Sequence, residues 1–130
     1  MATWRELSLE CQKAAKNLLR GPEQDQCPRS SINRSYYAAY AALAGKLEGK
    51  VVYKEGRENP SHAYLPAYIL HNMNSLSPDA RQILKKAIGR LWKARVNADY
   101  IPANYSDREM ALNSLRDANT VLDALEIDHE

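Results

Sequence analysis

The chain has 130 residues and a mass of 14.7 kDa, which is the usual size of one domain with one hydrophobic core. Its 45% hydrophobic residues, 26% charged residues and net charge of +2 exclude intrinsic disorder as a description of the whole chain. The longest apolar stretch, residues 36–44, is far shorter than the roughly 20 residues that cross a bilayer. The first ten residues include three charged ones and no apolar region of the kind found in a secretory signal. We therefore expect a single cytoplasmic domain over residues 1–130, without a membrane segment.

The sequence lacks the usual signatures of cofactor and metal enzymes. Its two cysteines and three histidines are scattered and have no metal-ligand spacing. The glycine-rich motifs of dinucleotide and nucleoside triphosphate binding are absent, as are the motifs of serine hydrolases and zinc proteases. We expect neither a metal site nor a cofactor.

The first half of the chain contains two helical patterns. A capping box over residues 3–6, followed by apolar residues at helical spacing, predicts a helix over 3–20 that a glycine-proline pair terminates. A polar loop is expected over 21–31. Residues 32–47 contain no proline, and no glycine before Gly45, so they predict a second helix.

Three more helical patterns follow after a loop. We expect a helix over 61–74, kinked at Pro66. Residues 77–79 (SPD) predict the start of a fourth helix, whose apolar stripe leads to an exit over 97–102. A second capping box opens a fifth helix over 106–126. Since no strand pattern accompanies them, the sequence predicts an all-α fold, an up-and-down helical bundle of four to five helices.

One side of the second helix carries small residues at helical spacing. Arg34, Ala38, Ala41 and Gly45 share this side, so another helix should pack closely on it. This helix could belong to the same chain. Alternatively, it could come from a second copy across a two-fold axis, which would bring two Arg34 side chains into one cleft.

Three sequence blocks together resemble a known family. They are SINRSYYAAYAA over residues 31–42, Ser61-His62, and RVNADY over residues 95–100. Their order and spacing over residues 31–126 are similar to those of the HEPN domain family (higher eukaryotes and prokaryotes nucleotide-binding).

This resemblance implies a helical bundle, usually dimeric, often found beside a nucleotidyltransferase or in toxin–antitoxin and other defence systems. Many members are metal-independent RNases, in which four to six residues separate an arginine from a histidine, and the pairs from two protomers meet in the dimer cleft. Arg34 matches the arginine, but position 41, where the histidine would stand, is alanine. Because Ala41 cannot transfer a proton, the sequence favours binding without cleavage.

Four residues are candidates for ligand binding on the resemblance and on their chemistry: Asn33, Arg34, Tyr37 and His62. The planar guanidinium of Arg34 can bind a phosphate through several donors. In the alternative of an active RNase, His62 or Tyr37 would replace the missing acid or base beside Arg34. Otherwise His62 would bond a backbone carbonyl at the start of its helix, and the tyrosine would belong to the core.

Arg95 and Asp99 are four residues apart at the end of the fourth helix. This spacing predicts either a local ion pair or a turn that fixes the exit of the helix, in both cases with a structural role, and Tyr100 is expected to pack below it.

Charge is distributed unevenly along the chain. Residues 77–98 carry six cations and one acid, and residues 106–130 carry two cations and seven acids. A basic helix surface could bind a nucleic acid backbone. It could also bind the acidic C-terminal helix of this or a partner chain, or simply be solvated. The basic surface comprises Arg81, Lys85, Lys86, Arg90 and Lys93.

The sequence therefore favours a HEPN-like homodimer that pairs through the second helix and binds RNA or a nucleotide, or acts as a toxin–antitoxin or defence module, without RNase activity. Two alternatives stay open. One is an active metal-independent RNase, and the other is a structural partner of a nucleotidyltransferase or an antitoxin.

Overall fold

The computed structural model describes residues 2–53, 56–101 and 106–130, and over these ranges the chain is helical, with no strand. The elements are α1 (Trp4–Asn17), the short 3-10 helix η1 (Glu23–Asp25), α2 (Pro28–Leu47), α3 (Leu65–Asn72), α4 (Pro78–Tyr100) and α5 (Arg108–Ala124). The predicted all-α fold is confirmed. Among these helices, none combines the length and the hydropathy that a membrane span requires.

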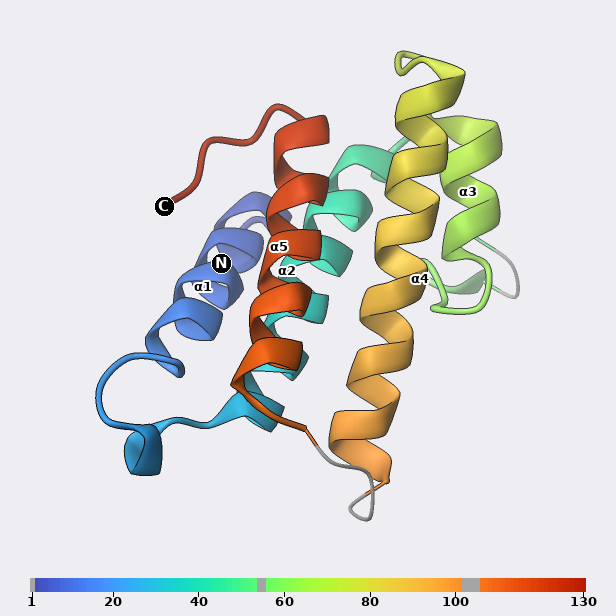
Figure 1. Cartoon of the computed structure of the whole chain (residues 1–130). Helices are drawn as coiled ribbons and strands as arrows, with labels where there is room; N and C mark the ends of the chain where they lie inside the picture. The colour runs from blue at the N-terminus through green and yellow to red at the C-terminus, as the bar shows by residue number, and fades with distance from the viewer. Residues whose placement is uncertain (1, 54–55, 102–105) are drawn as a thin grey trace.

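The long helices form an up-and-down bundle (Figure 1). In this view α1 and α4 run downward, α2 and α5 run upward, and α3 packs beside α4. Helix α2 is central, since it contacts all four other α-helices. The first turns of α2 and the last turns of α4 consequently lie at the same end of the bundle.

Polar side chains cap three of the helices. The hydroxyl of Thr3 accepts a hydrogen bond from the Glu6 amide at 3.1 Å, and that of Ser77 accepts one from the Ala80 amide at 3.1 Å, as the sequence predicts. For α5 the cap is Asp107, one residue later than the predicted capping box; its carboxylate accepts from the Met110 amide at 2.9 Å. These bonds satisfy amides that have no partner within the helix.

Two predicted boundaries in the first half of the chain are wrong. Helix α1 ends at Asn17, before the predicted end at 20. Helix α2 begins at Pro28, four residues before the predicted start at 32. Proline is well suited to the first turn, where its missing N–H costs no hydrogen bond. Because the preceding Cys27 forms no side-chain cap, the sequence has no polar signal for this start.

The predicted third helix over 61–74 is too long. The observed α3 spans Leu65–Asn72, and Pro66 lies in its first turn instead of kinking it. Residues 61–64 form a turn before it, in which the Tyr64 amide donates to the Ser61 hydroxyl at 3.2 Å. The predicted exit of the fourth helix over 97–102 contains the observed end of α4 at Tyr100; position 102 lies outside the described residues.

Helix α1 covers the small-residue side of α2. Ala38 and Ala41 are buried, and the Ser8 hydroxyl donates to the Ala38 carbonyl at 2.6 Å. A Cβ added at Gly45 would lie 2.9 Å from the Cβ of Trp4. The helix that packs closely here therefore belongs to the same chain, and a second copy cannot occupy this surface.

Candidate functional site

A cleft opens where the start of α2 lies beside the end of α4. Its volume is about 550 Å³. It is lined by Arg29, Ser30, Asn33, Arg34, Arg95, Ala98, Asp99 and Tyr100. Three guanidinium groups and one carboxylate thus share the cleft, which makes it positively charged.

The first turn of α2 adds to this positive charge. It begins with Pro28 and contains no acidic residue, and the free amides of a helix N-terminus carry partial positive charge. Arg29 donates from Nη1 to the Ala98 carbonyl at 2.8 Å and to the Asn97 carbonyl at 3.4 Å. These bonds join the start of α2 to the end of α4, where the carbonyls of a helix have no helical partners.

Arg34 lies exposed in the cleft lining and next to Cys11 of α1. Burial raises the pKa of the Cys11 thiol, although the neighbouring Arg34 charge acts in the opposite direction. Within the described ranges, no carboxylate forms a salt bridge with Arg34. Its guanidinium is therefore available to an incoming anion.

Arg95 is the buried cation of the cleft, with 7% of its surface exposed. Its Nε lies 3.2 Å from the Asp99 carboxylate, which confirms the predicted ion pair, and its Nη2 donates to the Tyr100 hydroxyl at 3.0 Å. The guanidinium carbon is 5.0 to 5.5 Å from four ring centroids, those of Tyr36, Tyr37, Trp92 and Tyr100. Cation–π contacts and the ion pair together compensate for its burial.

Two of the four candidate ligand residues support Arg95. The Asn33 amide lines the cleft and donates to the Asp99 carboxylate at 2.7 Å, so Asp99 joins Asn33 of α2 to Arg95 of α4. Tyr37 is half-buried, its ring centroid lies 5.0 Å from the Arg95 guanidinium carbon, and it is not among the residues that line the cleft.

His62 lies beside this cluster, in the turn before α3. Its ring stacks on Trp92 with a centroid distance of 4.6 Å and an angle of 17°, and its Nδ1 forms a hydrogen bond with the Tyr36 hydroxyl. Burial lowers the pKa of His62, and the charges of Arg95 and Arg57 lower it further. The imidazole is thus neutral near pH 7 and bound to a side chain, outside the residues that line the cleft.

Ala41 is covered by α1 and is 1% exposed. It follows Arg34 by seven residues, about 10 Å along the helix axis. No proton-transferring side chain is therefore present at the position where the family resemblance expects the histidine. In the described parts of the chain, no group of three or more histidine, cysteine or acidic residues is placed to hold a metal ion.

The predicted basic surface of α4 divides into two parts. Arg81 donates to the Leu70 carbonyl of α3 at 2.9 Å, and Arg90 pairs with Asp117 of α5 at 2.9 Å. These two arginines therefore join α4 to α3 and to α5. The other three residues of the basic surface are exposed, and none of them forms a salt bridge within residues 2–53, 56–101 and 106–130. They are Lys85, Lys86 and Lys93.

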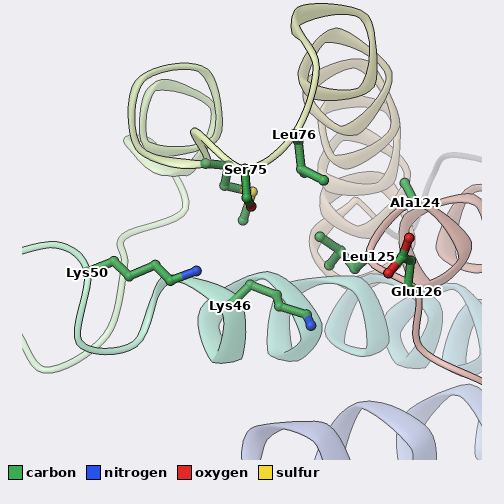
Figure 2. A pocket seen from close by; sticks show the side chains of 8 residues that line it. Lys46, Lys50, Ser75, Leu76, Ala124, Leu125 and Glu126 are labelled. Atoms are coloured by element: carbon green, nitrogen blue, oxygen red, sulfur yellow. The ribbon is translucent and has the colours of Figure 1, made fainter.

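A smaller pocket lies at the opposite end of α2, between the turn after α3 and the end of α5 (Figure 2). Its volume is about 220 Å³. Lys46 and Lys50 line it together with Glu126 and apolar side chains such as Leu76 and Leu125. Two ammonium groups and one carboxylate give it less positive charge than the cleft at the start of α2.

Sequence reasoning placed Asn33 and Arg34 in the functional set but missed Arg29 as a site residue, and it gave Arg95 and Asp99 a structural role only. One signal was present for Arg95. It follows Leu91 by four residues and precedes Ala98 by three, which puts a charged residue on the apolar stripe of its helix. A buried cation at such a position requires specific partners.

Comparison with known proteins gave one family match. The model of the HEPN domain family matches residues 1–128, which is nearly the whole chain. Searches of the curated proteins and of the solved structures gave no match.

Proposed function

Since the chain belongs to the HEPN domain family, we propose that it binds phosphate groups of RNA or of a nucleotide in the cleft between α2 and α4, and that it does so without cleaving RNA. The observation that carries this proposal is the charge of the cleft. Arg29, Arg34 and Arg95 share it with a single carboxylate, Asp99, and the N-terminus of α2 opens into the same space.

The roles of the three arginines differ. Arg29 and Arg95 are bound to protein groups and hold the cleft in shape. Arg34 is exposed and forms no salt bridge in the described part of the chain. A phosphate would bind Arg34 through charge-assisted hydrogen bonds, for which a guanidinium provides two parallel donors.

The absence of cleavage rests on the missing general acid or base. Position 41 holds a buried alanine, and His62 is stacked on Trp92 and bound to Tyr36. Loss of a general acid or base typically lowers a rate by about 10²–10⁴-fold. Activity through His62 would need the imidazole to leave both of these contacts.

The test uses single-stranded RNA in chelator, with binding and cleavage measured on the same samples. We expect the wild-type protein to bind RNA and leave it intact, and Arg34→Ala to bind about tenfold more weakly because a charge-assisted contact is lost. Arg5→Ala is the matched control, since Arg5 is an exposed arginine at the opposite end of α2. Equal binding by both variants would contradict the proposal. If the wild-type protein cleaves RNA and Arg34→Ala abolishes this cleavage, the alternative of an active RNase is correct.

The proposed partners are a second copy of the chain, a nucleotidyltransferase or an antitoxin, as the family resemblance implies. Because α1 covers Ala38, Ala41 and Gly45 of α2, the proposed dimer forms at the exposed start of this helix, with the Arg34 cleft as the proposed contact. Co-purification with neighbouring gene products tests the two heterologous partners, and the oligomeric state of the pure protein tests the dimer.

A further inference from the structure

The outer surface of α4 continues from the cleft without any acidic residue. From residue 81 to residue 98 the helix contains no aspartate or glutamate. The two arginines of the basic surface on this stretch bind α3 and α5. The three exposed lysines of the basic surface (Lys85, Lys86 and Lys93) form no salt bridge with a carboxylate in the part of the chain that the structure describes. The surface they form is therefore positively charged and suited to binding a polyanion.

A glycine interrupts this surface. Gly89 is exposed in the middle of α4, and a Cβ added there would meet nothing within 4 Å. Glycine lowers helix stability relative to alanine, and no packing within the described chain requires it at this position. Residues three and four apart are neighbours on a helix. Gly89 is therefore a gap on the helix surface, bordered by Lys85, Lys86, Trp92 and Lys93.

Exposed aromatic rings lie between this gap and the cleft. Trp92 is 37% exposed although His62 stacks on its ring and the Arg95 guanidinium carbon lies 5.2 Å from its centroid. Tyr100, in the cleft lining and also in contact with Arg95, is 65% exposed. Val96, half-buried, lies between them at a spacing of four residues from each. Large aromatic side chains at the surface beside cations are the pattern of proteins that stack unpaired bases.

We infer that α4 binds single-stranded nucleic acid along this surface, with unpaired bases stacked on Trp92 and Tyr100, and with backbone phosphates paired to Lys85, Lys86 and Lys93. The inference rests on the proposed function of the cleft, which would hold a further phosphate of the same strand. The gap at Gly89 lets a base lie close to the helix beside Trp92. A duplex would not bind in this way, because its bases are already stacked inside it.

The first experiment separates bases from phosphates. An oligouridine of about twelve nucleotides and an abasic oligomer of the same length are titrated into the protein at one salt concentration. We expect the oligouridine to bind about 5- to 100-fold more tightly than the abasic oligomer, since stacked bases contribute to affinity. Equal binding of the two would overturn the inference and leave the cleft proposal standing. Absence of binding to both would overturn both.

A substitution at Gly89 tests where the bases bind. Gly89→Leu fills the gap without removing a charge, and Ala67→Leu adds comparable bulk at an exposed position on α3. We expect Gly89→Leu to remain folded and to bind oligouridine at least fivefold more weakly, with unchanged binding of the abasic oligomer. Ala67→Leu should match the wild type. An unchanged affinity of Gly89→Leu for oligouridine would contradict the proposed position of the bases beside Gly89.

Tryptophan fluorescence gives a direct signal. The chain has two tryptophans, so Trp4→Phe leaves Trp92 as the single emitter. A base stacked on Trp92 quenches its emission, and we expect quenching by oligouridine and none by the abasic oligomer. If a polyglutamate peptide displaces oligouridine and gives the same quenching, the surface binds an acidic protein segment, and the inference is wrong.

Discussion

At the scale of single residues, Arg95 is the side chain on which the cleft depends most. A lysine at this position keeps the charge but cannot provide the planar fork that binds Asp99 and Tyr100 at once. We expect Arg95→Lys to lower the free energy of unfolding by about 2–3 kcal/mol, through lost charge-assisted hydrogen bonds and weaker cation–π contacts. Urea unfolding measures this change.

The control for this prediction is Arg90→Lys. Arg90 also pairs with a carboxylate, Asp117 at 2.9 Å, but its side chain is 57% exposed. Surface pairs contribute little, so we expect a loss of at most about 1 kcal/mol. Similar losses for the two variants would show that burial does not distinguish the two ion pairs.

His62 predicts a dependence of stability on pH. Burial lowers its pKa below the ordinary value of 6.5, and Arg95 and Arg57 add to this effect. At pH values between the pKa of His62 in the folded protein and its pKa in the unfolded chain, the unfolded chain binds more protons than the folded protein. The free energy of unfolding therefore decreases as the pH drops below about 6.5. Tyr36 and Tyr40, which also contact the ring, stay neutral in this range because burial raises the pKa of both hydroxyls.

His129 has the opposite effect on the pH dependence of stability, so it has to be replaced before the effect of His62 can be measured. Burial opposes its protonation, but hydrogen bonds to Asp123 and to the Glu130 carbonyl outweigh this and raise its pKa. In a His129→Gln background we expect the free energy of unfolding to decrease as the pH is lowered from 7 to about 5.5. This range lies above the pH at which most carboxylates titrate. Adding His62→Gln should abolish this slope; a slope that persists would assign it to other groups.

The sequence allowed Asn33 and Arg34 to be selected through the family resemblance, and the Arg95–Asp99 pair through its spacing within one helix. It did not show that Asn33 binds Asp99, since this contact joins two helices that are far apart in the chain. Nor did it show that Tyr36 binds His62. Helical periodicity assigns a residue to a side of its helix, but the partner on that side is set by how the helices pack.

At the scale of elements, two helical glycines predict opposite effects of the same substitution. Gly89→Ala adds a Cβ into open space on α4, so we expect stabilisation by about 0.4–1 kcal/mol from the reduced entropy of the unfolded chain. Gly45→Ala places a Cβ 2.9 Å from that of Trp4. Helices α1 and α2 must then move apart, which we expect to cost about 1–3 kcal/mol.

Thermal and urea unfolding of the two variants measures the difference in sign. Stabilisation by Gly45→Ala would mean that α1 shifts on α2 without loss of packing. Destabilisation by Gly89→Ala would indicate that the monomer already uses the space above Gly89.

Helix boundaries could be predicted where a local side chain marks them. Thr3 and Ser77 cap α1 and α4 as expected because the bond joins residues three apart in sequence. The start of α2 was misplaced because Cys27 forms no side-chain cap. The first residues of this missed turn carry Arg29 and Ser30, so the same error hid part of the cleft.

At the scale of the whole molecule, the up-and-down arrangement follows from helices of similar length joined in sequence around α2. This arrangement brings the start of α2 and the end of α4 to one end of the bundle (Figure 1). The three arginines that line the cleft (Arg29, Arg34 and Arg95) are thereby brought together at that end. A positively charged cleft of this kind attracts negatively charged molecules.

The charge of the cleft predicts how the proposed dimer should behave. If two copies meet at their Arg34 clefts, guanidinium groups of like charge are brought together, which opposes association. An anion bound between the copies removes this repulsion, and by mass action it stabilises the dimer that binds it. We therefore expect sedimentation equilibrium to show monomer in chloride and an increasing fraction of dimer as phosphate or oligouridine replaces chloride at constant ionic strength.

Arg34→Ala distinguishes this mechanism from a dimer formed elsewhere. The variant removes one repelling cation from each copy together with its donors for the anion, so we expect it to dimerise more readily in chloride and to respond less to phosphate. Arg5→Ala should behave like the wild type, because Arg5 lies at the other end of α2. A dimer of equal strength in both anions, unchanged by Arg34→Ala, would place the interface on a surface away from the cleft.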